Sequence, residues 1–375
     1  MEVGATMSEW KTSALKAANV RVRKGDGLTS RQMKEGEYPV VAGGLSYCGT
    51  HNSFNRNENS ITVSASGANA GAILFHKSKI FATDCSTVEW DGSQVFLYYA
   101  LAHRQKEFTA MQSGLAQPHV YPRDIEKFIL SYPIDIKEQF RIAAVLASAD
   151  EAVAASRALV ERYAAVKQGL MQDLLGKGKP IRLGNVCSVV GGSTPTTSEG
   201  KYWNGKHVWI TPTDLSVLES VTIDGSQRHL SDEGLRRATG RLLPENSVII
   251  SCRAPVGYCA VVTVPFSFNQ GCKALVCHAI HPIFLYYQLS GAKEQLENFS
   301  SGTTFLELPR RELERFEVHC PDLDEQQRIA EILLAADARL TAERERLRKL
   351  ENIKRGLMDD LLTNRVSTDK LQRGA

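Results

Sequence analysis

The chain carries one sequence pattern twice. Residues 138–175 and 325–362 align without a gap at a shift of 187 residues, and 17 of their 38 positions are identical. Because 187 is half of the 375-residue chain, the repeat predicts a tandem duplication in which both halves fold alike. The agreement is strongest at the two ends of the segment, where Glu138–Ala143 matches Glu325–Ala330 and Lys167–Leu175 matches Lys354–Leu362.

Each copy of this segment is predicted to be one long helix. Apolar residues recur in steps of four and three, and proline is absent. We expect spacer helices over residues 138–175 and 325–362, each roughly 57 Å long. A narrow apolar seam on so long a helix needs a partner, and the obvious partner is the other copy. The seam residues are Ile142, Leu146, Val153, Val160, Leu170, Leu174, Ile329, Leu333, Leu340, Leu347, Leu357 and Leu361.

The segments ahead of the two helices read as mixed domains. Short apolar runs bounded by Gly, Asn and Pro predict strands at 61–64, 72–75, 248–251 and 260–264. A helical stretch follows in each half, at 95–112 and 282–299. The expected fold class is α+β, with mixed α/β domains over 1–137 and 176–324, the two long helices between and after them, and a C-terminal tail over 363–375.

Composition and motif searches point away from catalysis. The 45 Lys and Arg residues nearly balance the 42 Asp and Glu residues, so charge alone does not indicate nucleic acid. The sequence lacks a phosphate-binding GxxxxGK[ST] loop, an HExxH zinc motif, a GxSxG elbow and the paired motifs of an adenine methyltransferase. Cys252 and Cys259 are expected to be buried and inert. We therefore expect a non-enzyme without a metal site of its own.

Location is predicted from what the sequence contains and lacks. Eight cysteines occur without a CxxC pair, which fits free thiols in a reducing compartment. We find no apolar run long enough to span a membrane and no signal peptide in the first residues. A cytoplasmic protein without membrane association is expected.

At several motifs the chain resembles the specificity subunit of type I restriction-modification systems. The resemblance covers about residues 8–362, although the first domain lacks two of the motifs found in the second. It rests on the repeated helix starts and on elements of the second domain in matching order: Gly191–Pro195, Tyr202-Trp203, Trp209–Thr211, Leu243–Ser247, Asn269–Gly271 and Ser300–Thr303.

The resemblance implies a DNA reader. It implies two target-recognition domains separated by an antiparallel coiled coil, reading a bipartite, asymmetric double-stranded DNA target. It also implies two docked copies of a DNA adenine methyltransferase subunit and, through them, two restriction and translocation subunits. S-adenosylmethionine, and ATP with Mg²⁺ where a restriction subunit is present, would be bound by those partners and no cofactor by this chain.

Polar and basic residues of the two domains are the expected DNA-binding residues. Side chains that donate or accept at groove edges read bases, while phosphate contacts position the protein. Trp203 and Trp209 are expected to pack in the core. The expected DNA-binding residues are Lys201, Tyr202, Lys206, His207, Thr211, Thr213, Arg228, Arg236, Arg237 and Arg253 in the second domain, and Arg21, Arg23, Lys24, Arg31, Asn55, Arg56, Asn69 and Lys77 in the first.

Two alternatives stay open from the sequence. The chain is compatible with the recognition subunit of a type IIB or IIG-like enzyme, because the difference lies in the partner. It is also compatible with a coiled-coil scaffold that binds a ligand other than nucleic acid.

One further expectation concerns the spacer: Asp at Leu146 and Leu333 is expected to separate the helices and leave each domain folded.

Overall fold

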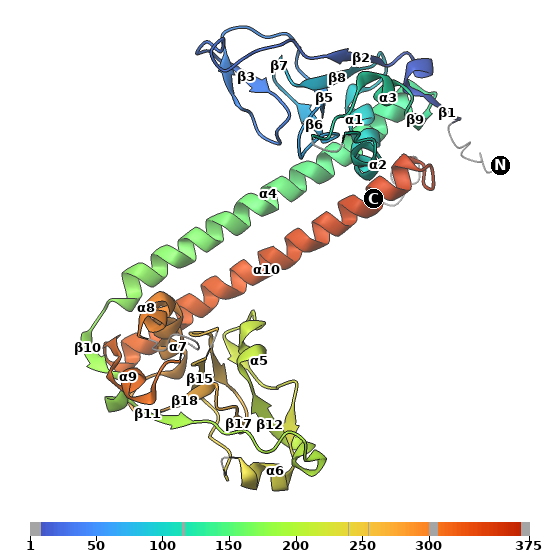
Figure 1. The fold of residues 1–375 in the computed structure, drawn as a ribbon. Helices are drawn as coiled ribbons and strands as arrows, with labels where there is room; N and C mark the ends of the chain where they lie inside the picture. The colour runs from blue at the N-terminus through green and yellow to red at the C-terminus, as the bar shows by residue number, and fades with distance from the viewer. Residues whose placement is uncertain (1–8, 115–116, 239, 254, 300–306, 369–375) are drawn as a thin grey trace, which may run out of the picture. The chain divides into compact units, whose positions relative to one another are not determined.

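The computed structural model describes residues 9–114, 117–238, 240–253, 255–299 and 307–368 (Figure 1). Its contacts divide the chain into two compact units. The first unit comprises residues 1–158 and 344–375, and the second comprises residues 159–343. Each unit therefore contains one mixed domain together with half of each long helix.

The described part of the first unit contains three small sheets. A four-stranded antiparallel sheet has the order β2-β8-β5-β6, a three-stranded sheet has the order β4-β3-β7, and β1 pairs with β9. These strands are β1 (Trp10–Ala14), β2 (Arg21–Lys24), β3 (Tyr38–Val41), β4 (Gly49–His51), β5 (Ser60–Ser64), β6 (Ile73–His76), β7 (Phe81–Ala82), β8 (Cys85–Glu89) and β9 (Ile129–Pro133).

Short helices complete the domain of the first unit. They are η1 (Leu15–Ala18), α1 (Gln94–His103), α2 (Gln105–Ala110) and α3 (Pro122–Glu126). The helical stretch predicted at 95–112 is confirmed, but it breaks at Arg104, where the backbone leaves the helical region at φ −99°. Phe96, Leu97 and Leu101 on α1 are fully buried in one core with Ile61 and Val63 of β5.

The second unit repeats this plan with a larger sheet. Five strands have the order β11-β18-β15-β16-β13, three have the order β14-β12-β17, and β10 pairs with β19. The strands are β10 (Lys179–Arg182), β11 (Cys187–Gly191), β12 (Trp203–Ile210), β13 (Thr222–Ile223), β14 (His229–Leu230), β15 (Ser247–Ser251), β16 (Cys259–Val262), β17 (Phe266–Phe268), β18 (Cys272–Cys277) and β19 (Glu317–Cys320).

Where the described part of the first unit contains four short helices, that of the second unit contains seven. They are η2 (Leu183–Asn185), η3 (Gly200–Tyr202), α5 (Pro212–Ser216), α6 (Asp232–Arg237), α7 (Pro282–Gly291), α8 (Lys293–Asn298) and α9 (Arg310–Arg315). The stretch predicted at 282–299 again divides in two, here at Ala292. The four strands predicted from short apolar runs are confirmed as β5, β6, β15 and β16.

The two long helices are confirmed. They are α4 (Ile136–Leu175) and α10 (Leu323–Leu362), each 40 residues. In the first unit Arg157 of α4 pairs with Glu351 of α10 at 2.8 Å, and in the second unit Lys167 pairs with Asp337 at 2.5 Å. Within each unit the two helix halves therefore lie antiparallel and in contact (Figure 1).

The ends of the predicted seam belong to the domain cores. Ile142, Leu146 and Leu361 are buried in the first unit's core, and Ile329 and Leu333 in the second unit's core. Asp at Leu146 or Leu333 would therefore place a charge inside a domain core. This contradicts the expectation that such variants leave the domains folded.

Along each long helix, the seam is more buried in the N-terminal half than in the C-terminal half. Val153 and Leu340 are buried, and the other seam residues are half-buried: Val160, Leu170, Leu174, Leu347 and Leu357. Within the described ranges, none of the helices has the length and apolar character that crossing a membrane requires.

Candidate DNA-binding surfaces

Acidic residues of α6 hold three of the expected DNA-binding side chains. Nζ of Lys201 lies 3.2 Å from Glu233, while Lys206 and His207 both contact Asp232, at 3.3 and 2.7 Å. Hydrogen bonds from His207 and then Lys206 hold the pKa of the Asp232 carboxyl below its usual value. In this structure Lys201, Lys206 and His207 therefore all contact acidic residues of α6.

Gly234 brings α6 close enough for these ion pairs. A Cβ atom at this position would lie 2.0 Å from the Tyr202 carbonyl oxygen, so only glycine permits the approach. The N-cap residue Ser231 accepts a hydrogen bond from the Gly234 amide and donates one to the Lys201 carbonyl oxygen. The chain around Lys201 is thereby fixed against α6.

Arg228 is stacked on the core. Its guanidinium carbon lies 3.6 Å from the centroid of the Trp203 ring, and Trp203 meets Trp209 edge to face at 5.0 Å. Both indoles are buried, and their N–H groups donate to the carbonyl oxygens of Thr196 and Ser193. The expectation that the tryptophans pack in the core is confirmed, and Tyr202 is buried beside them.

Thr211 forms a capping box with Asp214 at the start of α5. The second carboxylate oxygen of Asp214 accepts from the Gln227 amide at 2.9 Å, so this group also holds a loop. The Thr213 side chain is exposed in the first turn of the same helix. Of the two threonines, Thr211 is therefore occupied by the helix cap and Thr213 faces solvent.

Arg253 pairs with Glu307 at 3.1 Å. Lys273, which the sequence analysis did not single out, lies beside the same carboxylate at 3.8 Å and donates to the Leu308 carbonyl oxygen at 2.6 Å. Lys273 is buried in the apolar strand β18, so its charge is satisfied locally. No local pattern marks such a lysine; only the fold brings the Leu308 carbonyl to it.

Two of the motifs that carry the family resemblance lie against each other in the second unit, whereas Ser300–Thr303 lies outside the described residues. The Ser193 amide donates to the Phe268 carbonyl oxygen, and the Asn269 side chain donates to Thr194 at 3.0 Å. A Cβ at Gly192 would lie 2.3 Å from the Asn269 carbonyl oxygen. The Gly191–Pro195 and Asn269–Gly271 motifs therefore pack against each other, which accounts for the glycine at position 192.

In the first unit, Asn55 and Arg56 are bound by the domain's own groups. Asn55 accepts from the Ala82 amide at 2.7 Å and donates to Ala82 O and Asp26. The Arg56 guanidinium donates to Thr87 Oγ1 and to two backbone carbonyl oxygens. Both side chains thus fasten loops to the β7–β8 region.

The basic residues of β2 differ in how they are paired. Arg21 lies 3.0 Å from Asp91, and Arg23 lies 3.8 Å from Glu89. Lys24, Arg31 and Lys77 are exposed, and no ion pair holds them in the described part of the chain. Lys77 lies beside a cavity of about 710 Å³ whose wall includes Tyr47 and Tyr98, and Asn69 is half-buried in a turn.

Arg236 and Arg237 are the corresponding cations of the second unit. They occupy the last turn of α6, where positive charge is favoured by the helix dipole. Both are exposed, and neither forms an ion pair with another described residue. Six of the eighteen expected residues are therefore exposed cations outside any described ion pair: Lys24, Arg31, Lys77, Arg228, Arg236 and Arg237.

The thiols lack the environment of a nucleophile. Burial raises the pKa of Cys252 to about 11 and that of Cys259 to about 12. All eight cysteines are free, and Cys48 is the exposed one. Among the described residues no group of three His, Cys, Asp or Glu side chains gathers in a way that could hold a metal ion.

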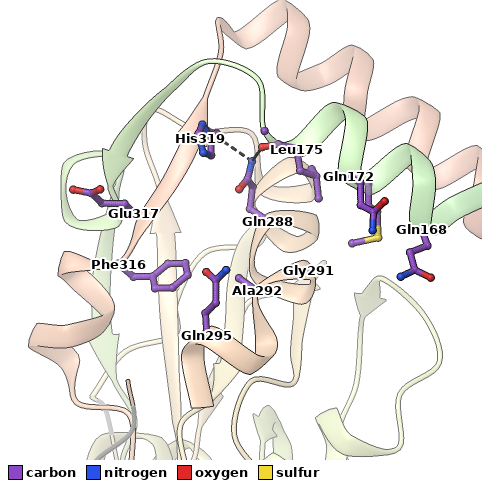
Figure 2. Close-up of a pocket in the computed structure, with 12 residues that line it drawn as sticks. Gln168, Gln172, Leu175, Gln288, Gly291, Ala292, Gln295, Phe316, Glu317 and His319 are labelled. Atoms are coloured by element: carbon purple, nitrogen blue, oxygen red, sulfur yellow. Dashed lines mark hydrogen bonds between the residues drawn. The ribbon is translucent and has the colours of Figure 1, made fainter. Parts of the chain in front are cut away.

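A pocket of about 450 Å³ lies beside the C-terminal end of α4 in the second unit (Figure 2). The Gln288 side chain donates to the carbonyl oxygens of Leu175 and His319, at 2.7 and 3.2 Å. It thereby satisfies a helix-terminal carbonyl that has no partner within α4. Gln168, Gln172 and Gln295 also line the pocket.

Comparison with known proteins adds a family to this geometry. A family model described as the type I restriction modification DNA specificity domain matches residues 7–161 and 177–352. The chain is 31% identical over 175 residues to the type I restriction enzyme MjaIX specificity subunit of Methanocaldococcus jannaschii, which covers 46% of this chain and 40% of that protein. The MjaVIII specificity subunit of the same organism is 22% identical over 344 residues, covering 84% and 81%.

Those alignments differ in extent. The aligned part spans about 40% of the length of the first curated relatives, the MjaIX and the Escherichia coli EcoR124I/EcoR124II specificity subunits. Among solved structures, the S subunit of a type I restriction-modification system from M. genitalium matches with a TM-score of 0.69 at 17% identity, covering 96% of this chain and 98% of that chain. That likeness shows a shared fold, with two β-rich domains and two long interacting helices.

Proposed function

Because the chain belongs to the type I restriction-modification DNA specificity family, we propose that it selects the DNA sequence on which a restriction-modification complex acts. The observation that carries the proposal is that the family model matches both halves of the duplicated chain. Each half supplies one domain, so one chain supplies two readers. The chain itself carries out no catalysis in this proposal.

Two unlike readers imply a bipartite, asymmetric target. The second domain carries Gly191–Pro195 and Trp209–Thr211, which the first domain lacks, so the two half-sites differ in sequence. Two domains that read one side of a duplex need half-sites about one helical turn apart, ~34 Å, or a multiple of that distance. We propose that the pair formed by α4 and α10 sets this separation.

The exposed cations make the first contacts with DNA. Lys24, Arg31 and Lys77 in the first unit and Arg236 and Arg237 in the second are available to phosphate or to guanine edges. The ion-paired side chains join them when phosphates compete with Asp232, Glu233 and Glu307 for Lys201, Lys206 and Arg253. Arg228, stacked on Trp203, presents a preoriented guanidinium.

Two copies of a DNA adenine methyltransferase subunit dock on the long helices in this proposal. Val166 on α4 and Ile353 on α10 are equivalent positions of the repeat, and both are exposed, at 50% and 57%. Exposed apolar side chains at equivalent places fit two equivalent partner sites. Restriction and translocation subunits join through the methyltransferases, and those partners bind S-adenosylmethionine, ATP and Mg²⁺ in the cytoplasm.

A gel-shift selection from random duplexes tests the proposal. The chain is co-expressed with its methyltransferase, and bound duplexes are recovered and sequenced at two salt concentrations. We expect one bipartite motif and an affinity that falls as salt rises, because phosphate contacts release counterions. Recovery of random sequences at both salt concentrations would reject the DNA-reading function.

The reading faces are tested with single variants. Arg236→Ala and Arg237→Ala together are expected to weaken binding of the selected duplex at low salt. Glu199→Ala, an exposed acid near the same face, is the control and is expected to leave binding unchanged or slightly stronger. Equal affinity of the arginine variant and the wild type would remove α6 from the reading face.

A further inference from the structure

Asp150 joins three elements of the first unit through one carboxylate. The hydroxyl of Tyr99, on α1, donates to Oδ2 of Asp150 at 2.6 Å. Nζ of Lys354, on α10, pairs with Oδ1 of the same group. Asp150 itself lies on α4, so a single side chain ties the domain's α1 to both long helices.

Asp337 makes the same arrangement in the second unit. The hydroxyl of Tyr287, on α7, donates to Oδ2 of Asp337 at 2.6 Å, and Nζ of Lys167 lies 2.5 Å from Oδ1. The lysine also lies 5.7 Å from the centroid of the Tyr287 ring. Asp337 is on α10 and Lys167 is on α4, so the assignment of helices is exchanged relative to the first unit.

These residues are the repeats of one another. Asp337 and Lys354 follow Asp150 and Lys167 by 187 residues, and Tyr287 occupies the place of Tyr99 in the repeated Phe-Leu-Tyr-Tyr sequence. The two domains, which differ elsewhere in sequence, thus share one Tyr–Asp–Lys arrangement at equivalent positions of the repeat. An exposed ion pair of the same helices is not repeated in this way. Arg157 is repeated as Arg344, but its partner Glu351 corresponds to Ala164.

The spacing makes each pair depend on the opposite helix. Asp150 and Lys167 are separated by about 25 Å along α4 at 1.5 Å per residue, too far to meet each other. The residue numbers of the two pairs, Asp150 with Lys354 and Lys167 with Asp337, add to the same total. The totals agree because both pairs join the same two positions of the repeat with the helices exchanged, so one antiparallel register accommodates both pairs.

Because the two tyrosines are buried, their hydrogen bonds favour one register of the helices over shifted ones. Tyr99 is 4% exposed and Tyr287 is fully buried, and the carboxylates are the hydrogen-bond partners of both hydroxyls. A buried hydroxyl without its acceptor is costly, so a shifted register is penalised. Burial, and then the hydrogen bond to the carboxylate, raises the pKa of each phenol, which keeps both as hydrogen-bond donors.

We propose that Asp150 and Asp337 are positioning residues that lock the register of α4 against α10 and the seating of each domain on them, and thereby fix the gap between the two DNA half-sites. The proposal rests on the proposed function, because a gap exists only for a chain that reads two half-sites. Lys167 interrupts the apolar seam, and this role explains why a polar residue occurs there. A polar residue in the seam packs less well than an apolar one, but its ion pair specifies one alignment of the helices.

The test measures gap discrimination by the full chain in complex with its methyltransferase. Affinity is compared for duplexes with the native gap and with gaps one base pair longer or shorter. Lys167→Met combined with Lys354→Met removes both ammonium groups and keeps the aliphatic stems. We expect the preference for the native gap to fall about tenfold. Lys167→Arg with Lys354→Arg retains the charges and is expected to keep the preference.

Arg157→Met is the matched control, because it removes the exposed pair with Glu351 on the same two helices without touching a tyrosine. It is expected to discriminate as the wild type does. An unchanged gap preference in the double methionine variant overturns the inference while the proposed function stands. A wild type without any sequence-specific binding overturns both.

A second variant guards against a folding defect. If circular dichroism shows that the methionine variant has lost helix, Tyr99→Phe with Tyr287→Phe takes its place, because it removes only the two buried hydroxyls. The same fall in gap preference is expected. Full discrimination by the phenylalanine variant would show that the carboxylates do not seat the domains, and would equally overturn the inference.

Discussion

The hydroxyl of Thr368 donates to Oε2 of Glu138 at 2.7 Å, which fastens the chain leaving α10 to the first turn of α4. Glu138 is buried and also lies 2.6 Å from Arg141. The second unit contains a counterpart, in which Lys177, just after α4, lies 3.0 Å from Glu325 in the first turn of α10. In each unit, the segment after one long helix is therefore tied to the start of the other.

Thr368→Val is expected to destabilise the first unit by about 1–2 kcal/mol, because a buried carboxylate loses a hydrogen bond. Hydrogen exchange followed by mass spectrometry measures the effect unit by unit. Amides at the start of α4 should exchange faster, and those of the second unit should not change. Thr363→Val, which alters an exposed hydroxyl on the same tail, is the control. Equal protection in both variants would show that the Thr368 contact is not stabilising.

Leu146→Ala and Leu333→Ala are each expected to cost about 2–5 kcal/mol, because both side chains are fully buried in a domain core. Urea unfolding measures the loss. Leu347→Ala, at a half-buried seam position, is expected to cost clearly less. The opposite order, with Leu347 the most costly, would mean that the helix pair and not the domain cores dominates stability at the seam.

Gly192→Ala is expected to destabilise the second unit by about 1–3 kcal/mol, since the new methyl group would meet the Asn269 carbonyl oxygen. The neighbouring Gly191 faces open space, so Gly191→Ala serves as the control and should change stability little. Thermal unfolding of both variants gives the comparison. If the two variants melt together, the close approach of these two motifs is not maintained in solution.

The first unit is expected to lose stability as pH falls from 6.5 toward 4. Burial lowers the pKa of His76 to about 4, and the unfolded chain binds its proton near pH 6.5. Between those values the unfolded state binds more protons than the folded state, so the free energy of unfolding is highest above pH 6.5 and falls as the pH drops toward 4. At pH 5 the loss is about 2 kcal/mol.

His76→Gln, which retains a polar group beside Thr62, is expected to flatten this pH dependence. The free energy of unfolding is measured with urea at pH 7 and pH 5 for the wild type and the variant. Hydrogen exchange of the β6 amides at the same two pH values assigns the change to the first unit. If the free energy of unfolding changes by the same amount between pH 7 and pH 5 in both proteins, a group other than His76 causes the pH dependence.

Repeats and periodic patterns in the sequence were enough to predict the long helices, the duplication and the strands β5, β6, β15 and β16. It failed where a contact joins distant residues. Lys206 lies on β12 and Asp232 begins α6, with α5, β13 and β14 between them, so nothing near Lys206 indicates that an acid will pair with it. The break at Arg104 also lies inside an unbroken helical pattern, and tertiary packing of α1 and α2 decides it.

The sequence contains a signal that could have singled out Asp150 and Asp337. Both are identical positions of the repeat that lie beside its apolar seam, as are Lys167 and Lys354. Identical charged residues in two otherwise diverged copies are the signal. Their pairing across the helices could not be read, because it requires the antiparallel register that only the three-dimensional structure supplies.

Sequencing of methylated sites in a host that expresses this chain with its cognate methyltransferase tests the central claim most directly. The account predicts one asymmetric motif made of two unlike half-sites with a fixed unread gap. A variant in which residues 176–324 are exchanged for the corresponding segment of another family member should change one half-site and keep the other. Methylation at a single continuous motif, or a change in both half-sites after the exchange, would contradict two independent readers on one chain.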